Sequence, residues 1–195
     1  MMYRFFVLFV WAMPAALAAQ TGPDFHRAVY TLHEQEIAKR AIRTQEEEGQ
    51  YEGAAAGRYT YIDTRYLDAA TGALISRVRR DAGNPEYIHI SEVNLYDATG
   101  QLMRDYGSIS MPWAPSQPMR TFINLHHYSG ELHSFRQYDI YGDVGYESCE
   151  GTFQGKRLRL SIDAVDITPE RVATPAYQAC FGGMKQTFAD YARPR

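Results

Sequence analysis

The chain has 195 residues, a formal net charge of −3 at pH 7 and two cysteines, with 45% hydrophobic and 22% charged residues. This composition is too apolar for an intrinsically disordered protein, and it lacks the basic excess that nucleic-acid binding requires. The length suits one well-buried domain. Tyrosine is unusually frequent, with 15 residues, and its ring favours half-buried β-strands.

The first segment has the three parts of a secretory signal peptide. Arg4 provides a positive start, residues 5–13 are uncharged and apolar, and Ala16 and Ala18 are small residues of the kind that precede a cleavage site. The apolar run is shorter than the roughly 20 residues that cross a bilayer. We therefore expect a cleaved signal peptide over residues 1–19, a periplasmic or secreted location, and no integral membrane segment after cleavage.

Amphipathic helical spacing follows the signal peptide. Residues 24–48 contain no proline or glycine and are rich in Ala, Glu, Gln, Lys and Arg. Phe25, Val29 and Leu32 recur at the spacing of one helix face. The pattern predicts a single amphipathic helix over 24–48, and this helix with a short linker would occupy residues 20–57.

From residue 58 onwards the chain is rich in β-prone residues, and turn signals recur. Four glycines separate the β-prone runs in the way that hairpin turns require, and four hairpins give eight sequential antiparallel strands. These glycines are Gly72, Gly100, Gly130 and Gly155. We place the strands near residues 58–67, 73–80, 87–96, 101–109, 119–128, 131–141, 144–153 and 157–165.

A twisted meander of about eight strands either curls into a half-barrel or closes into a barrel. We predict an α+β fold in which the N-terminal amphipathic helix packs on a curved antiparallel sheet, with a closed lipocalin-like barrel as the alternative. The sheet and tail, residues 58–195, would form one domain with the helix.

Both cysteines, Cys149 and Cys180, lie in the part of the chain that would be exported. In an oxidising compartment such a pair normally forms a disulfide. Their wide separation excludes a Cys-x-x-Cys redox motif. We therefore expect a structural bridge that ties the C-terminal tail to a strand.

The densest polar segment is residues 126–133, which contain three histidines. If Ser129 and Gly130 form a two-residue turn, His126 pairs directly with His133, with Cβ atoms about 5 Å apart. Two imidazoles at this distance can share a copper or zinc ion. A solvated hairpin face would carry the same pattern, because no third ligand follows from the spacing.

Two aromatic residues are candidates for contact with a ligand or partner. Trp113 lies in a segment with three prolines, residues 112–118, which stiffen the chain and disfavour ladder pairing. A rigid loop with an exposed tryptophan either anchors a partner or folds back over one end of the sheet. Tyr128, beside the histidine hairpin, is the second candidate.

The sequence contains no Gly-x-Ser-x-Gly, His-Glu-x-x-His, P-loop or dinucleotide-binding motif. It therefore favours an exported, non-catalytic binding or accessory protein that holds a small apolar ligand or an envelope protein on its tyrosine-rich sheet. Two alternatives stay open: a metal-binding protein that uses His126 and His133, and a hydrolase whose site has no recognised signature.

Overall fold

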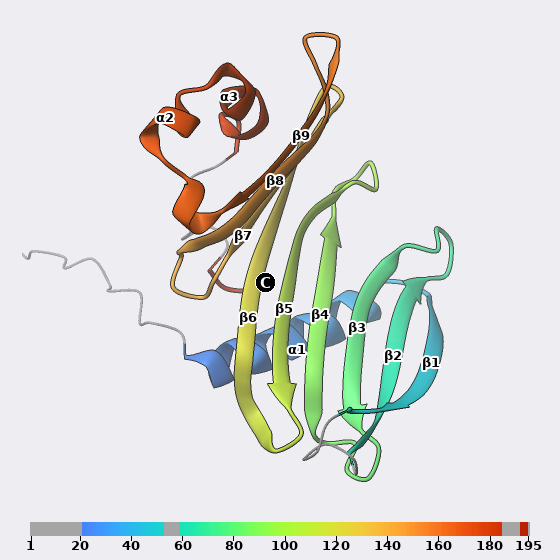
Figure 1. The fold of residues 1–195 in the computed structure, drawn as a ribbon. Helices are drawn as coiled ribbons and strands as arrows, with labels where there is room; N and C mark the ends of the chain where they lie inside the picture. Colours follow the sequence, from blue (N-terminus) through green and yellow to red (C-terminus); the bar gives the residue numbers. More distant parts are fainter. Residues whose placement is uncertain (1–20, 53–58, 185–191, 195) are drawn as a thin grey trace, which may run out of the picture.

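The computed structural model describes residues 21–52, 59–184 and 192–194. The expected signal peptide lies outside these residues. None of the helices in the described residues is long and apolar enough to cross a membrane. The elements, shown in Figure 1, are α1 (Gly22–Ala38), β1 (Ile42–Gln50), β2 (Thr60–Asp68), β3 (Leu74–Asp81), β4 (Ile88–Tyr96), β5 (Leu102–Met111), β6 (Ala114–Ser129), β7 (Leu132–Tyr138), β8 (Val144–Phe153), β9 (Lys156–Asp163), the 3-10 turn η1 (Ala164–Asp166), α2 (Pro169–Val172) and α3 (Pro175–Phe181).

Nine strands form one antiparallel sheet in which each strand pairs with its neighbours in the sequence, in the order β1 to β9. The sheet is curved and open, with β1 and β9 at its two edges (Figure 1). The predicted α+β class and the packed N-terminal helix are confirmed. The lipocalin-like closed barrel is not formed, and the sheet has one strand more than predicted.

The additional strand, β1, occupies the second half of the segment that was expected to be helical. α1 ends at Ala38, and β1 pairs with β2 over nine positions, from Ile42 opposite Asp68 to Gln50 opposite Thr60. Most β1 side chains are exposed. Packing against the core therefore adds nothing to the intrinsic helix preference of these residues. A continuous ladder with β2 outweighs that preference, which amounts to only a few tenths of a kcal/mol per residue, about 0.7 at most.

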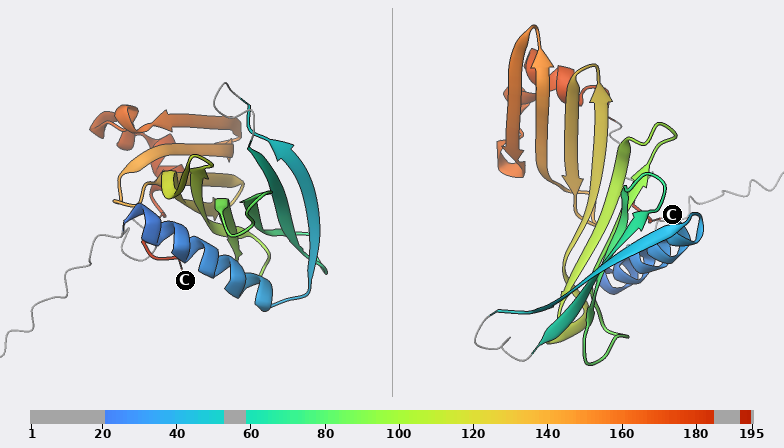
Figure 2. Two further views of the ribbon diagram at one scale, coloured as in Figure 1. Left: turned by 90° about the horizontal axis from the view of Figure 1, so that it is seen from below. Right: turned by 90° about the vertical axis from the view of Figure 1, so that its right-hand side faces the viewer.

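α1 crosses one face of the sheet, over β3, β4, β5 and β6 (Figure 2). The predicted apolar stripe is buried there, and Phe25 is fully buried. Two helix histidines also face the sheet. Nδ1 of His26 lies 2.9 Å from the hydroxyl of Ser108, and Nδ1 of His33 lies 2.7 Å from that of Ser76. The helix therefore docks through polar as well as apolar contacts.

The C-terminal helices cover another part of the same face, where α3 contacts β6, β7 and β8. The predicted disulfide is present: Cys149 on β8 is bonded to Cys180 on α3, with Cα atoms 6.0 Å apart. The hydroxyl of Ser134 donates to the carbonyl of Cys180 at 2.7 Å. Side chains of α1 and α3 join one hydrophobic core, so both helical layers stabilise a single domain.

We expect loss of the disulfide to lower the free energy of unfolding by about 3 kcal/mol, because the bridge closes a loop of about 30 residues in the unfolded chain. Urea unfolding of the native protein with and without reductant measures this difference. A variant with Cys149→Ser and Cys180→Ser should match the reduced protein and show no response to reductant. Equal stability of the oxidised and reduced protein would contradict the expectation.

Candidate functional site

The face of the sheet opposite the helices carries most of the polar and aromatic side chains that are organised into networks. The strand register places these residues side by side across the sheet, and α1 and α3 contact the other face (Figures 1 and 2). We call this surface the open face. It comprises Asp63, Arg77, Arg79, Glu92, Asp105, Asn124, His126, Tyr128, His133, Phe135, Gln137, Tyr146, Ser148, Glu150, Arg159 and Ser161.

A chain of hydrogen bonds crosses the centre of the open face, from β7 through β6 to β5 and back. Gln137 donates to the side-chain oxygen of Asn124 at 3.0 Å, and Asn124 donates to Asp105 at 2.7 Å. The second oxygen of Asp105 lies 2.9 Å from Nε2 of His126. Nδ1 of His126 lies 3.0 Å from Nε2 of His133. Each member therefore fixes the orientation of the next.

The hydrogen-bond chain also fixes the tautomers of its two histidines. A carboxylate only accepts, so Nε2 of His126 is the nitrogen that donates to Asp105, and in the neutral form of this imidazole Nδ1 accepts. In that form, His133 donates from Nε2 to Nδ1 of His126. Burial and the neighbouring His126 lower the pKa of His133, although Glu150 acts in the opposite direction. His133 is thus held as a neutral imidazole at neutral pH.

The register of the histidine hairpin differs from the prediction. The turn contains Gly130 and the residue after it, so that Tyr128, and not His126, lies opposite His133. His126 pairs with Phe135. The shift amounts to two positions, which keeps both histidines on the same face. They consequently meet as diagonal neighbours, with stacked rings whose centroids are 5.3 Å apart.

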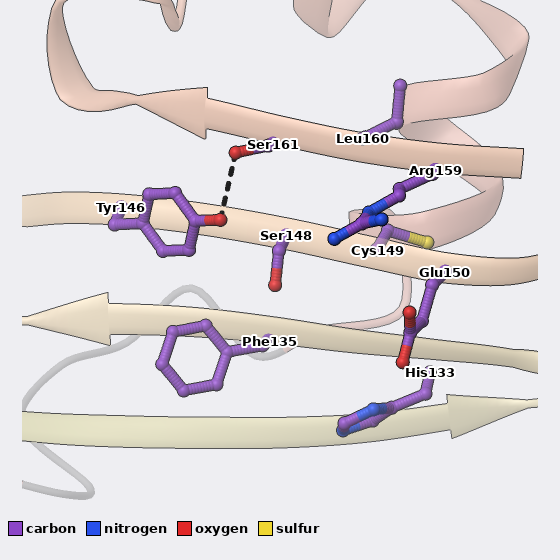
Figure 3. A pocket seen from close by; sticks show the side chains of 9 residues that line it. All are labelled: His133, Phe135, Tyr146, Ser148, Cys149, Glu150, Arg159, Leu160 and Ser161. Carbon is purple, nitrogen blue, oxygen red and sulfur yellow. Dashed lines mark hydrogen bonds between the residues drawn. The ribbon is translucent and has the colours of Figure 1, made fainter.

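A pocket of about 250 Å³ lies beside His133 on β7, β8 and β9 (Figure 3). Its open-face lining combines aromatic rings, hydroxyl groups and two opposite charges. The hydroxyl of Tyr146 is hydrogen-bonded to that of Ser161 at 2.9 Å. The lining residues on the open face are His133, Phe135, Tyr146, Ser148, Glu150, Arg159 and Ser161.

A second polar network lies on the open face near β1. Both Arg77 and Arg79 donate to the carboxylate of Asp63, each with a shortest distance of 2.6 Å. Burial alone would raise the pKa of Asp63, but the hydrogen bonds from the two arginines hold it below its ordinary value. Arg79 also lies over the ring of Tyr61, 3.8 Å from its centroid. This cluster rigidifies the face at its β2–β3 end.

The two predicted contact residues are exposed but lie far apart. Tyr128 is 38% exposed and stacks on His133, with ring centroids 4.6 Å apart. Trp113 is 53% exposed and lies 6.3 Å from the ring of Tyr59. The whole length of β6 separates Trp113 from Tyr128, so the two do not form one site.

The proline segment after Trp113 is the start of β6 and not an unpaired loop. Pro118 lies opposite Ser110, and the register with β5 shifts twice in this region. β7 pairs with β6 only from Ile123 onwards, so the first part of β6 has one neighbouring strand. Proline is compatible with such an edge-like position, because a strand with a single neighbour has one side on which no N–H has to pair.

The predicted metal ligands, His126 and His133, are adjacent but engage each other. His89 lies on β4, where its Nδ1 is 3.1 Å from the Tyr51 hydroxyl and not near this pair. Within the described part of the chain, no group of three or more His, Cys, Asp or Glu side chains is arranged to hold a metal ion. Copper or zinc binding therefore remains a prediction that rests on two ligands.

Sequence reasoning did not identify Asp105, Gln137 or the Asp63 cluster. The strand register could have identified them, because counting outwards from each glycine turn places these side chains beside the histidines or the arginines. The fold and site together define an open single-sheet α+β protein with one helix-covered face and one polar face. Comparisons of the chain with protein-family models, characterised proteins and solved structures found no match.

Proposed function

We propose that this chain is an exported, non-catalytic accessory protein that binds a protein partner of the cell envelope through the open face. One observation carries the proposal: a broad sheet face, opposite the helices, carries interlocked polar side chains and exposed tyrosine. Its export follows from the predicted signal peptide and agrees with the disulfide. Trp113 remains a predicted second contact at the far end of β6.

The composition of the open face favours a protein partner over an apolar ligand. Tyrosine and arginine are enriched at the centres of protein interfaces, and both occur beside the pocket, as Tyr146 and Arg159. Glu150 lies opposite His133 and beside Arg159. Paired opposite charges favour a partner with complementary charges and disfavour a purely apolar molecule.

Preorganisation supports the same conclusion. The hydrogen-bond chain that ends at His133 holds five side chains in one arrangement. Binding to such a surface loses little side-chain entropy. The adjacent pocket of about 250 Å³ can accept one side chain of the partner, next to the exposed ring of Tyr128.

Site-specific photo-crosslinking in intact cells tests the proposal. A photoreactive residue at Tyr128 should yield a defined crosslinked species, whereas the same residue at Tyr141, which is 72% exposed in the β7–β8 turn, should not. Arg159→Glu should reduce the yield from Tyr128, and Arg171→Glu, a matched exposed charge reversal on α2, should leave it unchanged. Equal yields from Tyr128 and Tyr141 would contradict the proposal.

Metal binding is the second candidate function, because the two imidazole nitrogens of His126 and His133 lie only 3.0 Å apart. A copper or zinc ion would replace their mutual hydrogen bond. Titration of the metal-free protein with zinc or copper would then show tighter binding for the native protein than for His133→Ala. Equal affinities would exclude the site.

A further inference from the structure

The two edge strands, β1 and β9, lie at opposite ends of the curved sheet (Figure 1). Among the described residues, no strand pairs with the outer side of either one. β1 has nine residues and β9 has eight, and most of their side chains are exposed. Edges of this length present a row of backbone N–H and C=O groups to which another strand can add.

The two edges carry opposite charges. β1 contains three consecutive glutamates and one arginine, which give it a formal charge of −2. β9 contains one lysine, two arginines and one aspartate, which give it a formal charge of +2. Like charges that lie opposite each other destabilise a strand pair. The charges therefore disfavour pairing of two β1 edges or of two β9 edges, and they favour pairing of β9 with β1.

The hydrogen bonds inside the sheet determine which backbone groups of each edge point outwards. The N–H of Tyr51 donates to the carbonyl of Tyr59, and bonded residues alternate along an antiparallel strand. Even-numbered residues of β1 therefore direct their backbone groups away from β2. At the other edge, Gln154 and Gly155 form a two-residue turn with positive φ, which closes with Lys156 bonded to β8. Odd-numbered residues of β9 therefore direct their backbone groups outwards.

One antiparallel register between β9 of one copy and β1 of another joins these outward groups and the opposite charges at once. Glu46 then lies opposite Arg159, and Glu48 lies opposite Arg157. All four residues direct their backbone groups outwards, so both pairs are of the hydrogen-bonded type. Side chains that lie directly opposite each other share one face and interact. A shift of two positions in either direction keeps only one glutamate opposite an arginine.

We propose that this chain assembles end to end through its sheet edges, with β9 of one copy adding to β1 of the next. The interface uses different strands of the two copies, so each added copy leaves one free β1 and one free β9 at the ends of the assembly. A second copy of the chain is thus the partner that fits both edges.

The strand register also determines how successive copies face. Glu46 and Glu48 lie on the helix-covered side of the sheet, because Glu47 between them lies opposite Asp63 of the open face. Arg159 lies on the open face, so the second copy must be turned over to bring Glu46 beside it. The open faces consequently alternate between the two sides of the joined sheet. They are not stacked on each other, so assembly and binding of an envelope partner can fail independently.

Analytical ultracentrifugation of the purified protein over a range of concentrations tests the proposal. We expect the average mass of the native protein to rise above that of one chain as the concentration increases, and to rise less at high salt. Glu48→Arg and Arg157→Glu each place like charges opposite each other and should weaken association at least about tenfold. Circular dichroism checks that each variant is folded.

A mixture of the two single variants separates a specific pairing of edges from a general loss of charge. The Glu48→Arg variant offers a native β9 to the native β1 of the Arg157→Glu variant, and the two substituted edges also carry opposite charges. An equimolar mixture should therefore associate as strongly as the native protein, although neither variant does so alone.

Matched charge reversals away from both edges complete the test. Glu131→Arg and Arg171→Glu change exposed residues in the β6–β7 turn and on α2 and should leave association unchanged. A native protein that stays monomeric at every concentration would overturn the proposal. A mixture of Glu48→Arg and Arg157→Glu that associates no better than each variant alone would also overturn it.

Discussion

Replacing Arg136 by methionine should lower the free energy of unfolding by about 3–5 kcal/mol, because it leaves Glu147 as an uncompensated buried charge. Both partners are almost fully buried, so water cannot substitute for the lost guanidinium. The same change also removes the cation that lies 5.6 Å from the ring centroid of Phe181. Urea unfolding at neutral pH, followed by circular dichroism, measures the difference.

Two controls separate the buried charge from the loss of the arginine itself. Arg136→Met combined with Glu147→Leu removes both charges and should recover most of the stability, since an apolar pair of similar size is often neutral or stabilising. Arg27→Met disrupts an exposed pair with Asp24 and should cost less than about 1 kcal/mol. If the double variant were as unstable as Arg136→Met, the uncompensated charge would not be the cause.

Acidification should already destabilise the fold between pH 7 and pH 5, before most carboxylates titrate. Three buried histidines, His26, His33 and His89, have pKa values below the ordinary 6.5, in each case chiefly through burial. The pKa of His33 falls to about 4, because the charge of Arg80 adds to its burial. The folded state therefore keeps these imidazoles neutral, while the unfolded chain takes up protons below pH 6.5.

The free energy of unfolding therefore falls as the pH falls, because the unfolded chain takes up protons that the folded chain does not. The stability contributed by His33 is complete above pH 6.5 and is lost between about pH 6.5 and about pH 4. Within this window His33 alone reduces the free energy of unfolding by about 1.4 kcal/mol for each pH unit of acidification. His26 and His89 act in the same direction, because burial lowers the pKa of each.

Urea unfolding at pH 7.5, 6, 5 and 4 checks the prediction. His33→Asn keeps a hydrogen-bonding group near Ser76 but cannot titrate, so its stability should fall less steeply with acidification, by about one proton's share. A stability that stays constant between pH 7 and 5 would contradict the prediction.

The strand plan was predictable because its turns depend on local chemistry. All four turn glycines, Gly72, Gly100, Gly130 and Gly155, have positive φ in the structure, a conformation that other residues rarely adopt. Eight of the nine strands consequently lie at the predicted positions, although β6 begins at Ala114, well before the predicted residue 119. A hairpin turn depends on a few adjacent residues, so the sequence alone is enough to predict it.

Features that depend on contacts between residues far apart in the sequence were harder to predict. β1 has helix-prone glutamates, and only its pairing with β2 makes it a strand. The C-terminal helices, α2 and α3, are short, with proline at their first turns, and α3 packs on β6, β7 and β8. The contact between His126 and His133 was expected, but their link to Asp105 depends on a strand that lies 21 residues earlier. Such contacts require the register of the whole sheet.

The central claim, that the open face is covered by a protein partner in the cell, is tested most directly by hydroxyl-radical footprinting. Labelling of the purified protein is compared with labelling of the same protein in freshly isolated cell envelopes. We predict lower labelling in envelopes at Tyr128, Phe135 and Tyr146, with Tyr141 unchanged. Identical labelling of the open face in both samples, or protection confined to Tyr141, would contradict the claim.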